Sequence, residues 1–217
     1  MITMHDDTPT VAPATPTTTL GWAWPDAVLG FLGVHLGLRA EAAVVADLVE
    51  RGELRAAARR ARLLARVLGE HHRVEDEILW PALEARRPGF ADARLDLELQ
   101  HVQLDAALDD LVHDARTIDR LIPLLSDHLQ AEEQLALPVW LATFTPDDHA
   151  MFEHQLRRST PVRHIATMLS WLFDVTPHDV RPLATSRVPT GLRWAHHVVF
   201  RHLYSARYGR HAQLCPA

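Results

Sequence analysis

The chain has 217 residues and a mass of 24.4 kDa, enough for one domain of ordinary size with or without an added segment. Hydrophobic residues make up 47% and charged residues 23%, which excludes a disordered or fibrous chain. Cys215 is the single cysteine, so a disulfide framework, a cysteine zinc finger and an iron–sulfur cluster are excluded. The net charge of −6 disfavours binding to nucleic acid. No uninterrupted apolar run approaches 18 residues, so we expect no membrane partner.

Residues 1–20 are rich in threonine and proline and are expected to form a flexible leader, because they offer little apolar surface to bury. They lack the basic start and the apolar stretch of a secretory signal. We therefore expect a cytoplasmic protein.

Residues 21–144 have the pattern of an all-α protein, an up-down-up-down four-helix bundle. Strand signals such as β-branched alternation and Asn-Gly turns are missing from this region. Proline and glycine breakers separate four helical segments, and links this short force neighbouring helices to be antiparallel. The expected helices are 25–51 (stopped by Gly52), 53–81 or one turn beyond, 90–116 and 118–141.

Residues 145–217 are predicted to form a helical extension packed on the bundle. Thr145-Pro146-Asp147-Asp148 is a helix start, and four prolines (Pro161, Pro177, Pro182 and Pro189) divide the rest of the segment into short helices. The aromatic residues of this segment either pack it against the bundle or cover one end of the bundle and shape a substrate cavity; they are Trp171, Phe173, Trp194, Phe200, Tyr204 and Tyr208.

Each of the four bundle helices has a histidine in its apolar stripe. The second helix has the stripe Leu64, Leu68, His71, Glu75, Ile78 and Ala82, and the fourth has Leu121, Leu125, His128, Glu132, Leu135 and Val139. The two stripes are 57 residues apart, so the pattern H-x-x-x-E-[D/E]-x-x-x-x-P is an internal repeat. His35 and His101 occupy the stripes of the first and third helices.

These stripes indicate a metal site. A histidine and a glutamate at i and i+4 lie on one helix face, with Cβ atoms about 5–6 Å apart. Two carboxylates in an apolar core are costly unless they are paired or coordinated. The chain has no lysine and no arginine on these stripes, so a metal is the economical partner. Four imidazoles and two carboxylates are too many for one zinc ion, but they suit two ions that share both carboxylates.

The chain resembles the hemerythrin-like, or HHE cation-binding, family over about residues 25–141. The resemblance depends on His35, on His101 and on two motifs, His71-His72-Arg73-Val74-Glu75-Asp76 with Pro81 and His128-Leu129-Gln130-Ala131-Glu132-Glu133 with Pro138. It implies a four-helix bundle with a non-haem di-iron centre that binds or reacts with dioxygen. The implied metal ligands are His35, His71, Glu75, His101, His128 and Glu132.

The chain departs from the oxygen-carrying members of that family. They have a second histidine one turn after the first on their third helix, where this chain has Asp105. They also have an aspartate five residues after the last histidine, where this chain has Glu132 at four residues and Glu133 at five. These departures favour reaction at the metal or sensing over reversible oxygen transport. Asp105 is expected to reach the same metal, to lie just outside its ligands, or to face solvent.

Several neighbouring residues receive secondary roles. His72 is expected at a helix interface or just outside the ligands, Asp76 and Glu133 in solvent or paired with arginine, and Glu98 with Asp105 as possible catalytic residues beside the centre. Glu98 and His101 form an E-x-x-H pair typical of ferritin-like di-iron proteins, but a second such pair is missing. His196, His197 and His202 are a weaker alternative metal site that has no carboxylate nearby.

The sequence predicts a protein that binds and activates dioxygen or peroxide at two iron ions, with manganese as the alternative metal. The two open function classes are an oxidoreductase acting on a small molecule and a non-catalytic protein that binds, senses or stores oxygen, nitric oxide or iron. No nucleophile elbow, P-loop or G-x-G-x-x-G motif is present, so hydrolase, NTPase and Rossmann interpretations have no support.

Overall fold

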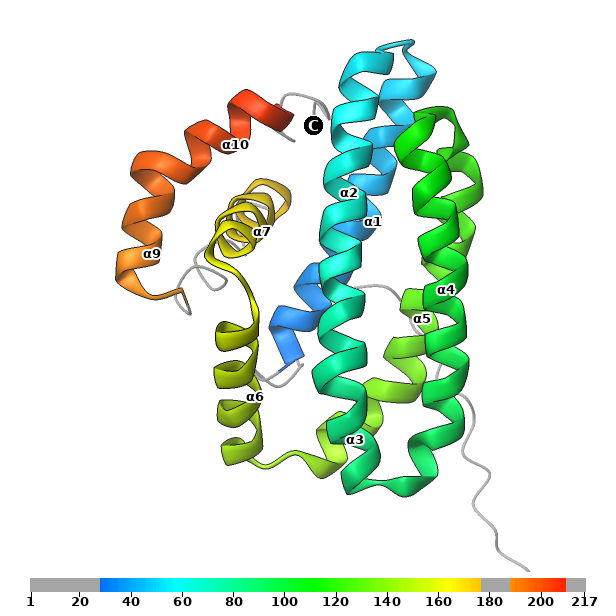
Figure 1. Ribbon diagram of the computed structural model, residues 1–217, viewed down its shortest axis with the longest axis vertical. Helices are drawn as coiled ribbons and strands as arrows, with labels where there is room; N and C mark the ends of the chain where they lie inside the picture. The colour runs from blue at the N-terminus through cyan, green and yellow to red at the C-terminus, as the bar shows by residue number, and fades with distance from the viewer. Residues whose placement is uncertain (1–27, 177–187, 210–217) are drawn as a thin grey trace, which may run out of the picture.

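The computed structural model describes residues 28–176 and 188–209, and helices form almost all of this part of the chain (Figure 1). Four long helices run side by side, and the later helices lie along one flank of them. The predicted all-α bundle is confirmed. The predicted leader 1–20, Pro25, Pro177, Pro182 and Cys215 lie outside the described residues.

The bundle helices match the expected segments with small differences at their ends. The third segment ends at His113 rather than at 116, because Asp114 adopts an extended conformation and its side chain accepts a hydrogen bond from the Arg116 amide. Gly52 has a φ of +74° in the first link, which favours glycine. The elements are α1 (Leu29–Glu50), α2 (Leu54–Val74), the π-helix η2 (Glu75–Leu79), α3 (Trp80–Arg86), the 3₁₀ turn η3 (Pro88–Phe90), α4 (Ala91–His113), the 3₁₀ turn η4 (Ala115–Thr117) and α5 (Ile118–Thr143).

The core of the bundle consists of two apolar clusters with a polar layer between them. One cluster includes Leu38, Leu68 and Leu104 and continues toward the α1–α2 link. The other includes Leu79 and Leu97 near α3. All four predicted histidines fall, along their own helices, between residues of the first cluster and residues of the second. The packing therefore holds the polar layer between apolar walls.

The predicted stripes are correct up to the glutamates and wrong beyond them. After Glu75, Leu79 and Leu83 are buried where Ile78 and Ala82 were expected, so the buried stripe continues through the π-helix η2 by steps of four residues. After Glu132, Leu135 is 42% exposed, and the stripe continues by two steps of four residues. The residues buried there are Ala136 and Trp140.

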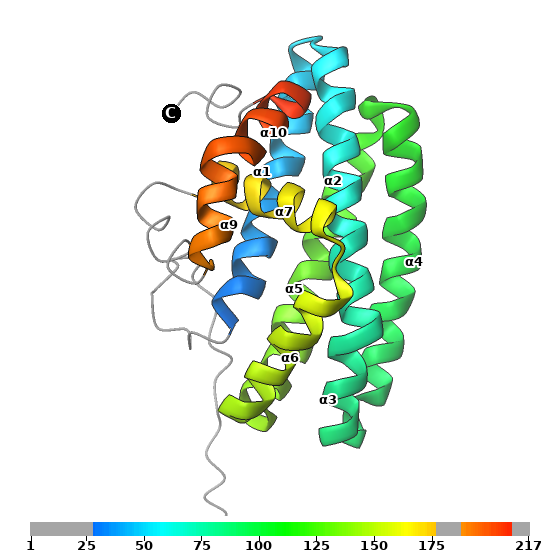
Figure 2. The same ribbon diagram turned by 60° about the vertical axis from the view of Figure 1, so that its left-hand side comes forward.

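The segment after the bundle forms α6 (Pro146–Ser159), α7 (Val162–Val175), α9 (Thr190–Ala195), the π-helix η5 (His196–Phe200) and α10 (Arg201–Tyr208). Thr145 and Asp148 form a reciprocal capping box, which explains the start of α6. Figure 2 shows α7 crossing the bundle beside α1 and α2, with α10 above it. The division of the chain at residue 144 stays a prediction.

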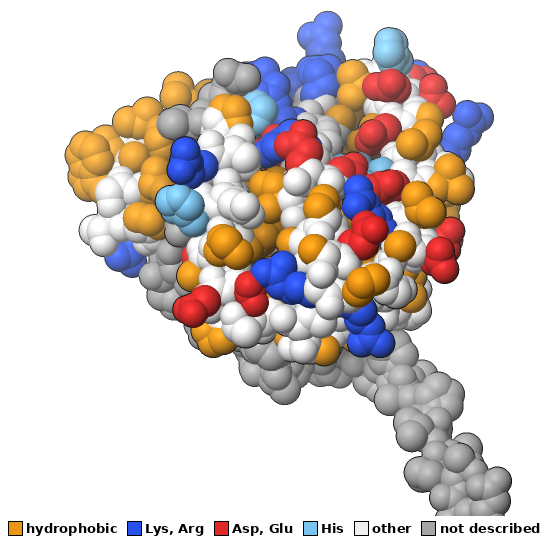
Figure 3. All heavy atoms as spheres, turned by 60° about the horizontal axis from the view of Figure 1, so that its bottom comes forward, with side chains coloured by type: hydrophobic (Ala, Val, Ile, Leu, Met, Phe, Trp, Pro, Cys, Tyr) orange, Lys and Arg blue, Asp and Glu red, His pale blue; other side chains and the backbone are white. Residues whose placement is uncertain are grey.

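Three of the predicted aromatic residues, Trp171, Tyr204 and Tyr208, are buried with the α1 and α2 side of the core. Trp194 is 67% exposed, so packing does not explain it. In Figure 3, which views the end of the molecule near α3 and α6, acidic and basic side chains are interspersed over the bundle. Hydrophobic side chains gather at its left edge, on the side where Figure 1 has α9.

One described helix, α1, is long and apolar enough to cross a membrane by length and composition alone, with a mean hydropathy of 1.4 over 18 residues. Polar and charged residues such as His35, Arg39 and Glu41 interrupt its apolar sequence, so a search for uninterrupted apolar runs does not identify it as a possible membrane span. A core helix of a bundle meets the same criterion, and α1 buries the polar side chains of His35 and Glu41 inside the fold.

Candidate metal centre

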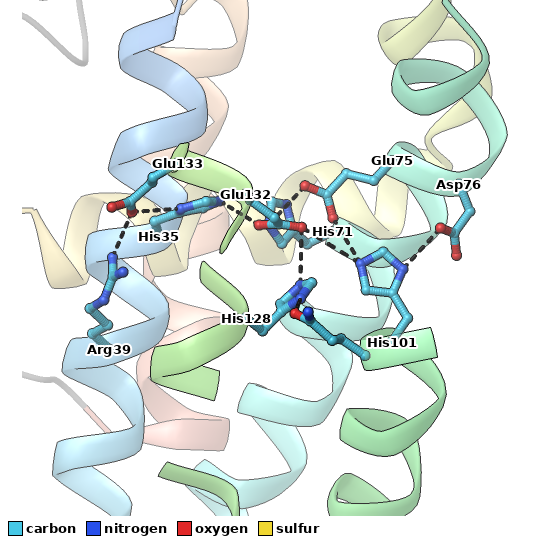
Figure 4. Close-up of polar contacts among 10 residues, drawn as sticks. His35, Arg39, His71, Glu75, Asp76, His101, His128, Glu132 and Glu133 are labelled. Carbon is cyan, nitrogen blue, oxygen red and sulfur yellow. Dashed lines mark hydrogen bonds and ion pairs between the residues drawn. The ribbon is translucent and has the colours of Figure 1, made fainter. Parts of the chain in front are cut away.

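Four helices each contribute one histidine to the polar layer, and two glutamates join them (Figure 4). The imidazoles come from α1, α2, α4 and α5, one from each; Glu75 begins η2, and Glu132 lies on α5 one turn after the histidine of that helix. Each of the six side chains is less than one tenth exposed. The structure therefore brings together His35, His71, Glu75, His101, His128 and Glu132.

Glu132 lies at the middle of the layer, and its two oxygens face different pairs of imidazoles. Oε2 is 3.2 Å from Nε2 of His35 and 3.9 Å from Nε2 of His71. Oε1 is 3.0 Å from Nε2 of His128 and 3.6 Å from Nε2 of His101. A carboxylate with this arrangement can place one oxygen on each of two ions.

Glu75 divides its oxygens in the same way. Its Oε1 is 3.3 Å from Nε2 of His71, and its Oε2 is 3.6 Å from Nε2 of His101. The donor atoms consequently form two overlapping groups that share both carboxylates. The groups are His35, His71, Glu75 and Glu132, and His101, His128, Glu75 and Glu132.

Three of the imidazoles are oriented by a side-chain oxygen at Nδ1, the nitrogen on the far side of the ring from the centre. His35 Nδ1 donates to Glu133 at 2.9 Å, and Glu133 also accepts from Arg39. His101 Nδ1 donates to Asp76 at 2.9 Å, as Figure 4 shows. The last of these contacts joins His128 Nδ1 to Gln100 Oε1 at 3.1 Å. Outer partners of this kind fix the tautomer and direct the Nε2 lone pair of each ring to the centre.

Burial and mutual contacts shift the pKa values of these groups in opposite directions. Burial and the charge of Glu132 raise the pKa of Glu75 well above its usual range. Burial opposes ionisation of Glu132, but its close contacts with the four surrounding imidazoles outweigh burial and hold the pKa of Glu132 well below its usual range. Burial lowers the pKa of His71 to about 4. Burial lowers the pKa of His101, but its hydrogen bond to Asp76 and its contact with the Glu132 carboxylate outweigh burial and raise the pKa to about 9.

The donor set fits a metal. Nε2 of all four histidines and both oxygens of the two glutamates are buried and lack a conventional hydrogen bond. Buried polar atoms are almost always satisfied in folded proteins, so a converging group of unsatisfied donor atoms calls for a ligand. Imidazole nitrogens with carboxylate oxygens suit iron, manganese and other transition-metal ions.

A comparison with protein families matches residues 30–140 to the hemerythrin HHE cation-binding domain. This chain belongs to the hemerythrin HHE family. Searches of curated proteins and of solved structures found no match. Hemerythrin domains bind metal ions, usually iron, and the buried histidine–glutamate groups of this chain fit that property.

The other predicted residues of this hemerythrin domain lie outside the two groups. Asp105 has a side chain that is 61% exposed, and it accepts a hydrogen bond from His72 Nδ1 at 3.2 Å. Glu98 bonds to Arg94 at 2.7 Å and makes no described contact with the centre, so the structure does not place it beside the metal as predicted. The difference arises because Glu98 is one turn before His101 on a more exposed part of α4.

The alternative site in the extension does not assemble in the described part of the chain. His196 contacts the Ser170 hydroxyl and the Phe173 ring, and His202 contacts the neighbouring Arg201. These histidines do not occur among the described groups of converging metal-ligating atoms. The proximity of His196, His197 and His202 in sequence does not bring their donor atoms together in the described structure.

Sequence reasoning missed the residues that orient the ligands. Asp76 and Glu133 were expected in solvent or paired with arginine, but each also accepts a hydrogen bond from an imidazole of the centre. A signal was present, because both occupy the second acidic position of the internal repeat. Gln100, one residue before His101, carried no such signal, since its partner comes from another helix.

Proposed function

We propose that this hemerythrin domain holds two iron ions and binds and activates dioxygen or peroxide as an oxidoreductase acting on a small molecule. The observation that carries the proposal is the division of each buried carboxylate between two pairs of imidazoles. Two ions that share both carboxylates would each have histidine and carboxylate ligands, and such ligands suit non-haem iron. Manganese is the competing metal for the same donors.

The iron ions would supply the redox chemistry, and the chain would supply ligands and a dry, fixed environment. The apolar clusters on both sides of the layer exclude water from it. Glu133, Asp76 and Gln100 hold three of the imidazoles in the ligating orientation. Phe31 contacts the rings of His35 and His71, with centroid distances of 4.1 and 5.6 Å, and covers that half of the centre.

The test is metal analysis followed by anaerobic titration of the iron-loaded, reduced protein with dioxygen. We expect two ions per chain and consumption of dioxygen in excess of iron when a reductant is supplied, since a catalyst turns over. Zinc-loaded protein is the matched control, because zinc has no redox chemistry. A stable, reversible adduct with no turnover would instead support the non-catalytic binding function. A single ion per chain, or no reaction of the iron form, would contradict the proposal.

A further inference from the structure

His72 is a fifth buried histidine beside the centre, and the two metal groups do not include it. His72 follows His71 directly on α2, so the two residues lie on different faces of the helix. The side chain of His72 is nevertheless only 4% exposed. Its Nδ1 lies 3.2 Å from Asp105 Oδ1, and its Nε2 is buried without a hydrogen-bond partner.

This pattern is the one found at the predicted ligands. His35, His101 and His128 each have Nδ1 on a side-chain oxygen and a buried Nε2 without a partner. Metal-ligating histidines usually donate the second ring N–H to a carboxylate or carbonyl. His113, in contrast, is exposed, and its Nδ1 contacts the carbonyl oxygen of Asp109 in its own helix.

The position of His72 assigns it to one half of the centre. Its ring stacks on that of His101, with centroids 4.0 Å apart and an interplanar angle of 14°, and lies 5.4 Å from the ring of His128. A nitrogen of His72 is within 4.8 Å of a nitrogen of each. Because Nδ1 is engaged by Asp105, Nε2 is the nitrogen left for a metal. Two nitrogens on one ion lie at most about 4.2 Å apart, twice a typical bond length, which is close to the spacing within this group.

We propose that His72 is a third imidazole ligand of the ion held by His101 and His128. This inference rests on the dinuclear site of the proposed function and makes that site asymmetric. One ion has three imidazoles, and the ion of His35 and His71 has two. An external ligand is then expected at the ion with fewer protein ligands. Asp105 acts as a positioning residue that holds His72 toward the centre.

The test counts coordinated imidazoles in the full chain loaded with cobalt(II), a paramagnetic ion that shifts the N–H proton of each coordinated ring out of the normal NMR range. The wild type should show a shifted exchangeable proton for each of His35, His71, His72, His101 and His128. His72→Gln should lose one of them, and the control His113→Gln should lose none. Asp105→Asn should keep the coordinated rings and weaken binding of one ion roughly 10–100-fold, as for other outer partners of metal ligands.

Identical proton counts in the wild type and in His72→Gln would overturn the proposal, and so would an unchanged affinity for cobalt in both variants. If His72→Gln does not fold, Asp105→Asn carries the test, and an affinity within twofold of the wild type would count against the proposal. The readout uses no dioxygen. If the protein does not react with dioxygen, the number of coordinated imidazoles can still be measured. If that number is wrong, only the role of His72 is contradicted and the proposed oxygen chemistry is not.

Discussion

At the residue scale, Glu132 determines how the centre is put together. Its side chain is fully buried and lies within 4 Å of all four predicted histidine ligands. A charge in such a place is costly without compensating partners, and these imidazoles or a metal provide them. The other glutamate contacts only His71 and His101 among these imidazoles, so the two carboxylates are not equivalent in the structure.

The first prediction compares a predicted ligand with a histidine that lies away from the centre. His128→Gln removes the imidazole nitrogen that lies 3.0 Å from Glu132, so at least one of the two expected ions should be lost. His113→Gln should keep the full metal content, because His113 is exposed at the end of α4. Elemental analysis of the purified variants measures both. Full metal in His128→Gln, or metal loss in His113→Gln, would mean that the ligand set is wrong.

The second prediction concerns pH. The hydrogen bond to Asp76 and the nearby Glu132 carboxylate raise the pKa of His101 to about 9 against the effect of burial, so without metal this imidazole holds its proton at neutral pH. A metal needs the neutral ring, and its binding must release that proton. The apparent affinity for metal should therefore increase about tenfold per pH unit for each released proton between pH 7 and 9. Competition with a chelator at several pH values measures the slope.

Asp76→Asn provides the control for this slope. The amide removes the negative charge beside His101 Nδ1, so the pKa of His101 falls. A smaller fraction of the imidazole then carries the proton that the metal must displace above pH 7. The variant should bind metal more weakly overall, but with a flatter pH dependence. Equal slopes in the two proteins would show that His101 does not govern the proton release.

At the element scale, the π-turn η2 sets the geometry on one side of the centre. It begins with Glu75 and Asp76, two consecutive acidic residues that both serve the centre. Glu75 faces the donor atoms, and Asp76 accepts from the outer nitrogen of His101. Such π-bulges are often found at functional sites. Leu79 at the end of this turn and Leu83 in α3 are both buried in the core.

The third prediction concerns the contact of α1 with α7. A Cβ atom at Gly37 would lie 2.6 Å from Trp171 Cη2 and 2.9 Å from Val175 Cγ2, whereas one at Gly33 would meet nothing within 4 Å. Gly37→Ala should lower the free energy of unfolding by about 1–3 kcal/mol through overpacking. Gly33→Ala should raise it by roughly 0.5–1 kcal/mol, because alanine is the better helix former. Urea denaturation measures both, and equal effects would contradict the close approach of α7.

At the scale of the whole molecule, a buried polar network joins the later helices to the bundle. Arg60 on α2 is fully buried and pairs with Glu41 on α1. It also donates to the Tyr204 hydroxyl at 3.1 Å, while Trp171 donates to Glu41 at 3.2 Å. These contacts connect α7 and α10 to the two helices that carry His35 and His71. The stability of the extension and that of the centre are therefore expected to be linked.

The fourth prediction is that removal of the metal destabilises the whole fold. Without metal, the buried carboxylates depend on protons and imidazoles for compensation, and burial with the charge of Glu132 raises the pKa of Glu75. A metal at 100 times its dissociation constant contributes about 2.7 kcal/mol. For a chain of 217 residues this corresponds to a rise in melting temperature of roughly 5–10 °C. Calorimetry with and without a chelator measures it; equal melting temperatures would argue against metal ligation by these residues.

The sequence alone determined the fold class and the candidate ligands of this hemerythrin domain, because helical periodicity places residues such as His71 and Glu75 on one face. It also placed His101 in the buried stripe of α4, whose residues Leu97, Leu104, Leu108 and Leu111 are all buried as expected. The same periodicity failed after Glu75 and after Glu132, where the buried residues follow steps of four instead of the alternating steps of three and four that were expected.

Only the tertiary structure decided how the donor atoms are shared. The division of the Glu132 oxygens between two pairs of imidazoles depends on how four helices pack, and no spacing along one helix specifies it. The same holds for His72, whose Asp105 partner is on another helix. Local periodicity fixes which face a side chain occupies, whereas contacts between helices depend on their relative positions, which the packing of the two apolar clusters sets.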